Sequence, residues 1–163
     1  MRVSTWQRQL REEAARTLAV FCVDGRYARY LDEFFESTLQ LEGADWLGVP
    51  GGAAALAGRE AAEGDGEYLW REVDFLVEAH QIEHVILIFH EDCGHYQRVL
   101  GSETPAEERA DTQRSDAMKV VAELGERHPS IGVKAYWQRG DDTAVYFDAL
   151  TPAASPPPAE PPD

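Results

Sequence analysis

At 163 residues, 44% of them hydrophobic, the chain is long enough to bury a sizeable core and has the composition of one globular domain. Its 15 basic and 30 acidic residues give a formal net charge of −15, so neither a nucleic-acid backbone nor an anionic membrane is an expected partner. No segment approaches a transmembrane span and the N-terminal residues lack the apolar core of a signal peptide, so we expect a cytoplasmic protein.

In chain order, the predicted elements alternate between helices and strands. Helical spacing of apolar residues predicts helices over residues 4–16, 30–39, 67–81 and 108–127, and a short helix or a loop over residues 94–100. Apolar or alternating runs predict strands over residues 18–23, 44–49, 85–89, 131–138 and 143–150. The small and acidic segment 53–66 carries no pattern that assigns it to either class.

This alternation predicts an α/β fold with a mainly parallel central sheet, flanking helices and an antiparallel edge strand in a final hairpin. We expect residues 1–150 to form a single domain that begins with an N-terminal helical arm. Six of the last thirteen residues are proline, so residues 151–163 are expected to be a disordered, extended tail.

The most informative stretch is the apolar run over residues 85–89, which is typical of a strand buried on both faces of a parallel sheet. It leads directly into His90-Glu-Asp-Cys93-Gly94. The other cysteine, Cys22, closes the apolar run of the first predicted strand. Ligands of open α/β sheets bind at the carboxyl ends of strands, so the sequence predicts a site there.

Two thiolates and one imidazole, from Cys22, Cys93 and His90, are a donor set that suits zinc and leaves a fourth tetrahedral position for water or substrate. Bound zinc lowers the pKa of its water from about 15.7 to about 7, so hydroxide is available at neutral pH. Asp24 follows Cys22 by two residues and could itself take the fourth position. Arg26 could hold Asp24 away through a charge-assisted pair.

Together, Cys22-Val-Asp24-Gly-Arg26 and His90-Glu-Asp-Cys93-Gly94 resemble the signature of the β-class carbonic anhydrases, over roughly residues 18–150. The resemblance implies that Cys22, His90 and Cys93 bind Zn²⁺ and that Asp24 and Arg26 form a gating dyad. It also implies reversible hydration of carbon dioxide to bicarbonate, and a homodimer or higher homo-oligomer. For the proton shuttle we expect His95, with His84 as the second choice. Aromatic side chains are expected to line the substrate pocket, with Phe89, Tyr27 and Tyr96 as candidates.

Three departures from the family pattern bear on the substrate. Phe89 stands where the family has glycine before the histidine, Gly25 where it has serine, and residues 49–52 replace an Arg-Asn-Ala-Gly-like turn. They keep two alternatives open: a related zinc hydrolase that acts on carbonyl sulfide or carbon disulfide, and a non-catalytic zinc-binding homologue that acts as an interaction protein.

Overall fold

The structure is a computed structural model, and it describes residues 15–41 and 43–151. The predicted N-terminal arm and the proline-rich tail lie outside these residues, apart from residues 15, 16 and 151. Within the described residues, no helix has the length and apolar composition needed to cross a membrane.

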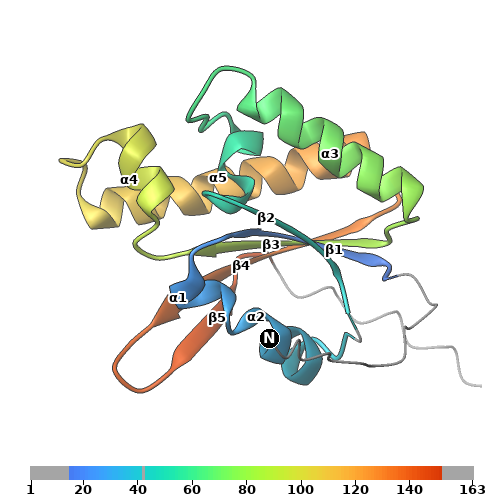
Figure 1. Ribbon diagram of the computed structural model, residues 1–163, viewed down its shortest axis with the longest axis horizontal. Coiled ribbons are helices and arrows are strands. Elements are labelled where there is room, and N and C mark those ends of the chain that lie inside the picture. The colour runs from blue at the N-terminus through green and yellow to red at the C-terminus, as the bar shows by residue number, and fades with distance from the viewer. Residues whose placement is uncertain (1–14, 42, 152–163) are drawn as a thin grey trace, which may run out of the picture.

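A five-stranded sheet in the order β2-β1-β3-β4-β5 forms the centre of the molecule (Figure 1). Its strands are Thr17–Cys22 (β1), Asp45–Val49 (β2), His84–His90 (β3), Gly132–Gly140 (β4) and Val145–Ala149 (β5). The first four strands are mutually parallel, and β5 pairs antiparallel with β4 at one edge. The predicted fold class and the antiparallel edge strand are therefore confirmed.

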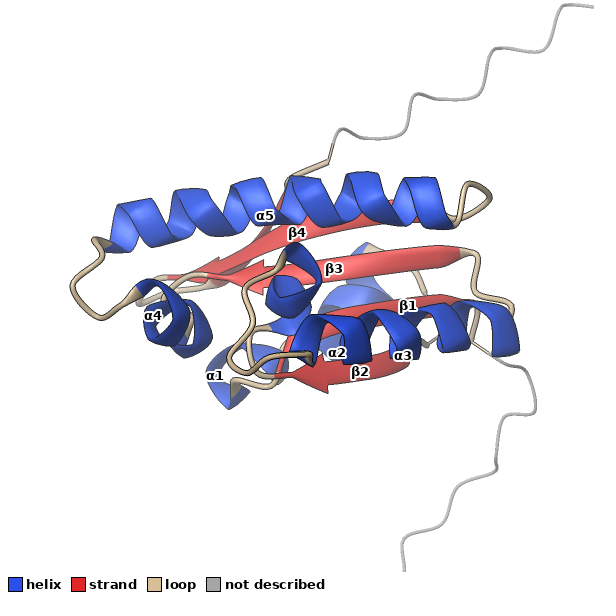
Figure 2. Cartoon of the chain, turned by 90° about the horizontal axis from the view of Figure 1, so that it is seen from above, coloured by secondary structure: helices blue, strands red, loops and turns tan. Residues whose placement is uncertain are grey.

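Helices cover both faces of this sheet. They are Gly25–Ala28 (α1), Leu31–Glu33 (α2), Asp65–Ala79 (α3), Gly94–Leu100 (α4) and Ala106–Arg127 (α5), with a π-helical turn at Phe34–Thr38 (η1) and a 3₁₀ helix at Gly52–Ala57 (η2). Figures 1 and 2 show α3, α4 and α5 on one face and α1 and α2 on the other.

The central strand β3 shows why the sheet is buried on both sides. Val85, Leu87 and Phe89 belong to the core that α3, α4, α5 and η2 cover. Ile86 and Ile88 belong to a second core beneath α2 and η1. Because successive side chains of a strand point to opposite faces, a continuous apolar run fits this position. Each fully buried side chain of this size stabilises the fold by about 1.5–3 kcal/mol.

The wide turn η1 begins with two consecutive aromatic residues that reach different parts of the sheet. Leu39 N–H donates to Phe34 O at 3.1 Å, across five residues instead of the four of an α-helix. The Phe34 ring stacks on Phe147 of β5 with centroids 3.9 Å apart, whereas Phe35 packs against Trp46 of β2 at 5.0 Å. One helical turn thus contacts both edge strands of the sheet.

Candidate metal centre

The three proposed ligands come from the carboxyl ends of two neighbouring strands. Cys22 ends β1 and His90 ends β3, and the two strands pair in parallel. Cys93 immediately precedes α4, as its N-cap residue. Between His90 and Cys93, Asp92 adopts a left-handed backbone conformation with φ +55°. Aspartate tolerates this conformation better than most residues. This tight turn brings Cys93 back beside the end of its own strand.

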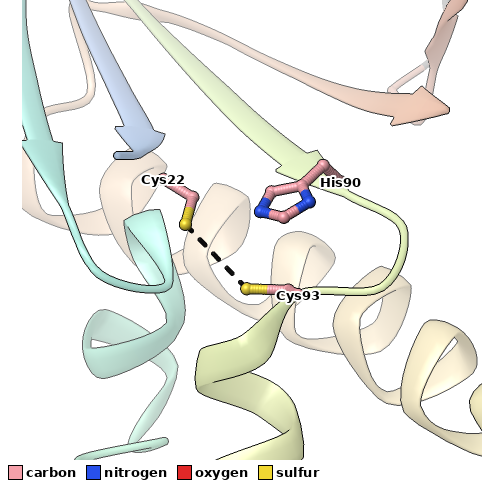
Figure 3. Close-up of side chains that lie close together, drawn as sticks. All are labelled: Cys22, His90 and Cys93. Atoms are coloured by element: carbon pink, nitrogen blue, oxygen red, sulfur yellow. Dashed lines mark hydrogen bonds between the residues drawn. The ribbon is translucent and has the colours of Figure 1, made fainter. Parts of the chain in front are cut away.

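The ligand atoms of Cys22, His90 and Cys93 all lie within 4.8 Å of one another (Figure 3). The two Sγ atoms are 4.0 Å apart, close to the separation of about 3.8 Å between two thiolates that each lie about 2.3 Å from a tetrahedral zinc ion. His90 and Cys93 are buried and Cys22 is half-buried. Of the described residues, these three form the cluster that can hold a metal ion.

His90 presents one ring nitrogen to this cluster without a protein partner. Its Nδ1–H donates to the Glu91 carbonyl oxygen at 2.7 Å, and because a carbonyl only accepts, the neutral ring carries its proton there. Nε2 therefore keeps its lone pair, and it is buried without a hydrogen bond. A buried polar atom left unpaired costs about 1–3 kcal/mol. A cation bound between Nε2 and the sulfurs would remove this cost, so the donor set fits a metal.

The two thiols share their proton unequally. The Cys93 thiol donates to Cys22 Sγ, and this bond, helped by the N–H groups of Asp24 and Gly51, lowers the pKa of Cys22. The same hydrogen bond, together with burial, raises the pKa of Cys93. Of the two thiols, Cys22 is thus the more acidic. A thiolate is the form in which cysteine ligates metals.

Asp24 and Arg26 form a closed ion pair beside the cluster. Arg26 Nε lies 3.1 Å from both carboxylate oxygens of Asp24, and Nη2 lies 2.7 Å from Oδ2. Asp24 also caps α1 by accepting the Arg26 backbone N–H at 3.0 Å. The Arg26 hydrogen bonds are the main reason why the pKa of Asp24 falls to about 2. Both carboxylate oxygens are engaged by Arg26, and Asp24 is not one of the clustered ligands.

The glycine turn after β2 is the part of the site that sequence reasoning read only as a departure. Gly51 N–H donates to Cys22 Sγ at 3.3 Å. Gly51 and Gly52 have φ of +83° and +58°, and a Cβ on Gly51 would lie 2.5 Å from the His95 ring. Positive φ and close approach both require glycine here. The paired glycines that follow β2 signal a tight turn, but they do not specify which side chain the turn approaches.

Several sequence expectations around the site are wrong. His95 Nε2–H donates to the Arg59 carbonyl at 2.8 Å, so this nitrogen is committed to the backbone and is not available as a proton shuttle. His84 begins β3, the strand that His90 ends, and so lies at the far end of the sheet from the cluster. Phe89 and Tyr96 are buried in the core rather than lining an open pocket. The Tyr96 hydroxyl donates to Asp116.

Tyr27 is the aromatic candidate that does contact a site residue. Its ring packs on His90 with centroids 4.4 Å apart and planes 31° apart. Burial is the main cause that raises the pKa of Tyr27 to about 12, so its hydroxyl is a hydrogen-bond donor at neutral pH. Local sequence carries no signal for this stacking, because Tyr27 and His90 come from different elements.

Comparison with known proteins identifies a family and a fold. Residues 12–145 match the model of a family described as "Putative carbonic anhydrase". An uncharacterized protein of Rickettsia bellii (strain RML369-C) is 24% identical over 114 residues, which cover 67% of this chain and 69% of that protein.

Solved structures of β-carbonic anhydrases share the fold. A carbonic anhydrase from Streptococcus mutans matches with a TM-score of 0.54 and 16% identity, over 88% of this chain and 87% of that one. One of two tetrameric β-carbonic anhydrases from Sordaria macrospora matches with a TM-score of 0.53 and 11% identity, over 83% and 81% of the two chains. At such low identities the likeness shows the architecture of the chain and no more.

Proposed function

Because the chain belongs to the carbonic anhydrase family whose model covers residues 12–145, we propose that it is a zinc enzyme that reversibly hydrates carbon dioxide to bicarbonate. The resemblance to β-class carbonic anhydrases that the two sequence motifs indicated is confirmed by this match and by the shared fold. We propose zinc as the metal, carbon dioxide as the substrate, and the residue roles that follow.

One observation carries it: a Cys22–His90–Cys93 cluster, within 4.8 Å, that leaves His90 Nε2 buried and unpaired. Two sulfur donors and one nitrogen donor select zinc over the hard cations, which prefer oxygen. Three protein ligands are the number typical of catalytic zinc sites, since structural sites usually have four.

When bound, zinc would supply water with a pKa near 7, compared with about 15.7 in bulk. The surrounding residues prepare the cluster for that ion. The Gly51 N–H stabilises the Cys22 thiolate, and the Glu91 carbonyl keeps the His90 proton on Nδ1. Arg26 engages both oxygens of Asp24, so that this carboxylate does not compete with water or substrate for the metal. Asp24 and Arg26 are therefore proposed as the gating dyad.

We also propose that the chain works as a homodimer or a larger homo-oligomer. The related Sordaria macrospora protein is described as tetrameric. In this chain, Val23 after β1 and Trp46 on the edge strand β2 are 50% and 42% exposed, and large exposed apolar side chains of this kind are enriched at interfaces. A cytoplasmic location agrees with the need to keep both cysteines reduced for metal binding.

A matched pair of histidines on one strand tests the function. His90→Ala removes the unpaired nitrogen, whereas His84→Ala changes the same residue type at the opposite end of β3. We expect wild-type protein and His84→Ala to bind one zinc per chain and to accelerate carbon dioxide hydration in stopped-flow measurements. His90→Ala should lose both properties while keeping its circular-dichroism spectrum.

Three other outcomes would contradict the proposal in different ways. Zinc binding with hydration at the buffer rate, together with turnover of carbonyl sulfide or carbon disulfide, would identify the related hydrolase. Zinc binding without turnover of any of these substrates would identify a non-catalytic zinc protein. Retention of zinc by His90→Ala would refute the ligand assignment itself.

A further inference from the structure

The geometry points to Tyr27 as a positioning residue for the His90 imidazole, acting together with Glu91. The inference rests on the proposed metal centre and adds residues that hold one of its ligands in place. Tyr27 comes from α1, Glu91 follows β3 directly, and both contact β4. α1, β3 and β4 thereby meet beside His90.

Tyr27 contacts His90 through the face of its ring. The centroids are 4.4 Å apart and the planes lie within 31° of parallel, a distance at which the rings are in contact and which matches aromatic packing. A flat neighbour on one face restricts rotation of the imidazole about its Cβ–Cγ bond. Because Nε2 must be aimed at the cluster to ligate a metal, that restriction bears directly on the metal.

Glu91 holds His90 and Tyr27 at the same time. Its carbonyl oxygen accepts His90 Nδ1–H at 2.7 Å, and its carboxylate Oε1 accepts the Tyr27 hydroxyl at 3.3 Å. The same Oε1 accepts Gly140 N–H at 2.6 Å, and the Glu91 N–H donates to the Gln138 carbonyl at 3.0 Å. Both the backbone and the side chain of Glu91 are thus fixed to β4.

The backbone of Tyr27 is anchored as well. The Gln138 side chain is buried, and its Nε2–H donates to the Tyr27 carbonyl at 2.9 Å. The ring of Tyr27 therefore approaches His90 from a fixed main-chain position, and its hydroxyl is tied at the far end. Groups that orient a metal-ligating histidine typically change metal affinity by about 10–100-fold when they are removed.

Two conservative and two disruptive variants test this role by metal binding, independently of turnover. Tyr27→Phe keeps the ring face, and Glu91→Gln keeps an oxygen acceptor for the hydroxyl and for Gly140 N–H. Tyr27→Ala removes the ring face, and Glu91→Ala removes the oxygen acceptor. Tyr68→Ala is the matched control, since Tyr68 is 53% exposed on α3.

We expect Tyr27→Ala and Glu91→Ala to weaken zinc binding about tenfold in competition with a chelator, in line with the loss of groups around a ligand. The cobalt-substituted form should also change its visible absorption, because the ligand field depends on the orientation of the imidazole. Glu91→Gln and Tyr68→Ala should match the wild type in both measurements. Tyr27→Phe, which keeps the ring face but loses the hydroxyl bond to Glu91, should lose less affinity than Tyr27→Ala. If Tyr27→Ala does not fold, Tyr27→Leu keeps apolar volume without the flat face and is expected to behave as the alanine variant should.

Wild-type affinity and spectrum in Tyr27→Ala or Tyr27→Leu would overturn the positioning role while leaving the metal centre standing. Equal losses in Tyr27→Phe and Tyr27→Ala would also overturn it, because the ring face would then not be the group that matters. If the wild-type chain itself binds neither zinc nor cobalt, the proposed function fails along with this inference. The two failures are therefore distinguishable in one set of titrations.

Discussion

Gly51→Ala tests whether the glycine turn is required for stability as well as for the contact with Cys22. The φ of +83° would cost alanine about 1–2 kcal/mol. The new Cβ would lie 2.5 Å from Cγ and Cδ2 of His95, about 1 Å inside an ordinary carbon contact. Displacing that ring breaks its 2.8 Å hydrogen bond to the Arg59 carbonyl, worth about 0.5–1.5 kcal/mol. The expected loss of stability is the sum of the two, about 1.5–3.5 kcal/mol.

The assay is urea unfolding of the metal-free protein in reducing buffer, read as the change in extrapolated free energy. Gly25→Ala is the matched control, since a Cβ there meets no atom within 4 Å and its φ is not positive. It should stay within about 0.5 kcal/mol of the wild type. In the double variant Gly51→Ala/His95→Ala the clash is absent, so we expect a favourable coupling of about 1 kcal/mol.

Two results would refute the steric reasoning. A Gly51→Ala protein within about 0.5 kcal/mol of the wild type would mean that the turn relaxes freely. Strictly additive effects of Gly51→Ala and His95→Ala would mean that the ring and the new Cβ do not meet, which would leave only the backbone contribution.

Three further predictions concern the chemistry of the site. Arg26→Ala should keep one zinc per chain but lower kcat/KM for hydration about 10–100-fold, because Asp24 is released. The control Arg29→Ala should keep the wild-type kcat/KM. Unchanged turnover in Arg26→Ala would refute the gating role. The hydrogen bonds from Cys93 and from Gly51 N–H lower the pKa of Cys22, whereas burial and the bond to Cys22 raise the pKa of Cys93. Peptide mapping of the metal-free protein at about pH 7 should therefore show that iodoacetamide alkylates Cys22 faster than Cys93. Faster alkylation of Cys93 would contradict this. His95→Ala should leave the buffer dependence of hydration unchanged, because Nε2 of His95 is bound to the Arg59 carbonyl in the wild type. If the variant lost rate and imidazole buffer restored it, His95 would be a proton shuttle.

The sheet could be predicted from the sequence because its strands have strong local patterns. The apolar run over residues 85–89 became β3, and the hairpin around residues 140–142 became β4 and β5. The segment 53–66 could not be assigned, since its alanines and glycines have no amphipathic period. Its 3₁₀ helix η2 is stabilised by tertiary burial of residues such as Ala53, Ala54 and Leu56.

The meeting of Cys22 and His90 could also be predicted, because parallel strand ends share one edge of the sheet. Side-chain directions around them could not. His95 is two residues from Cys93, but its orientation depends on the Arg59 carbonyl, which belongs to another element. The contact of Gly51 with Cys22 likewise depends on a left-handed backbone that a sequence pattern does not specify. Long-range hydrogen bonds set both orientations, and local sequence does not encode them.

The wide turn at Phe34–Thr38 carries one extra residue compared with a regular helix, and this has a consequence for insertions and deletions. Deleting one residue in the turn would restore ordinary helical hydrogen bonding but would rotate the chain beyond it by about 100°. Leu39 and Leu41, which follow the turn and pack against the core beneath α2 and η1, would then lose their places. A homologue with a regular helix here should therefore align with a single-residue gap and carry compensating changes at the positions of Leu39 and Leu41. The length of this segment is thus tied to the side chains that follow it.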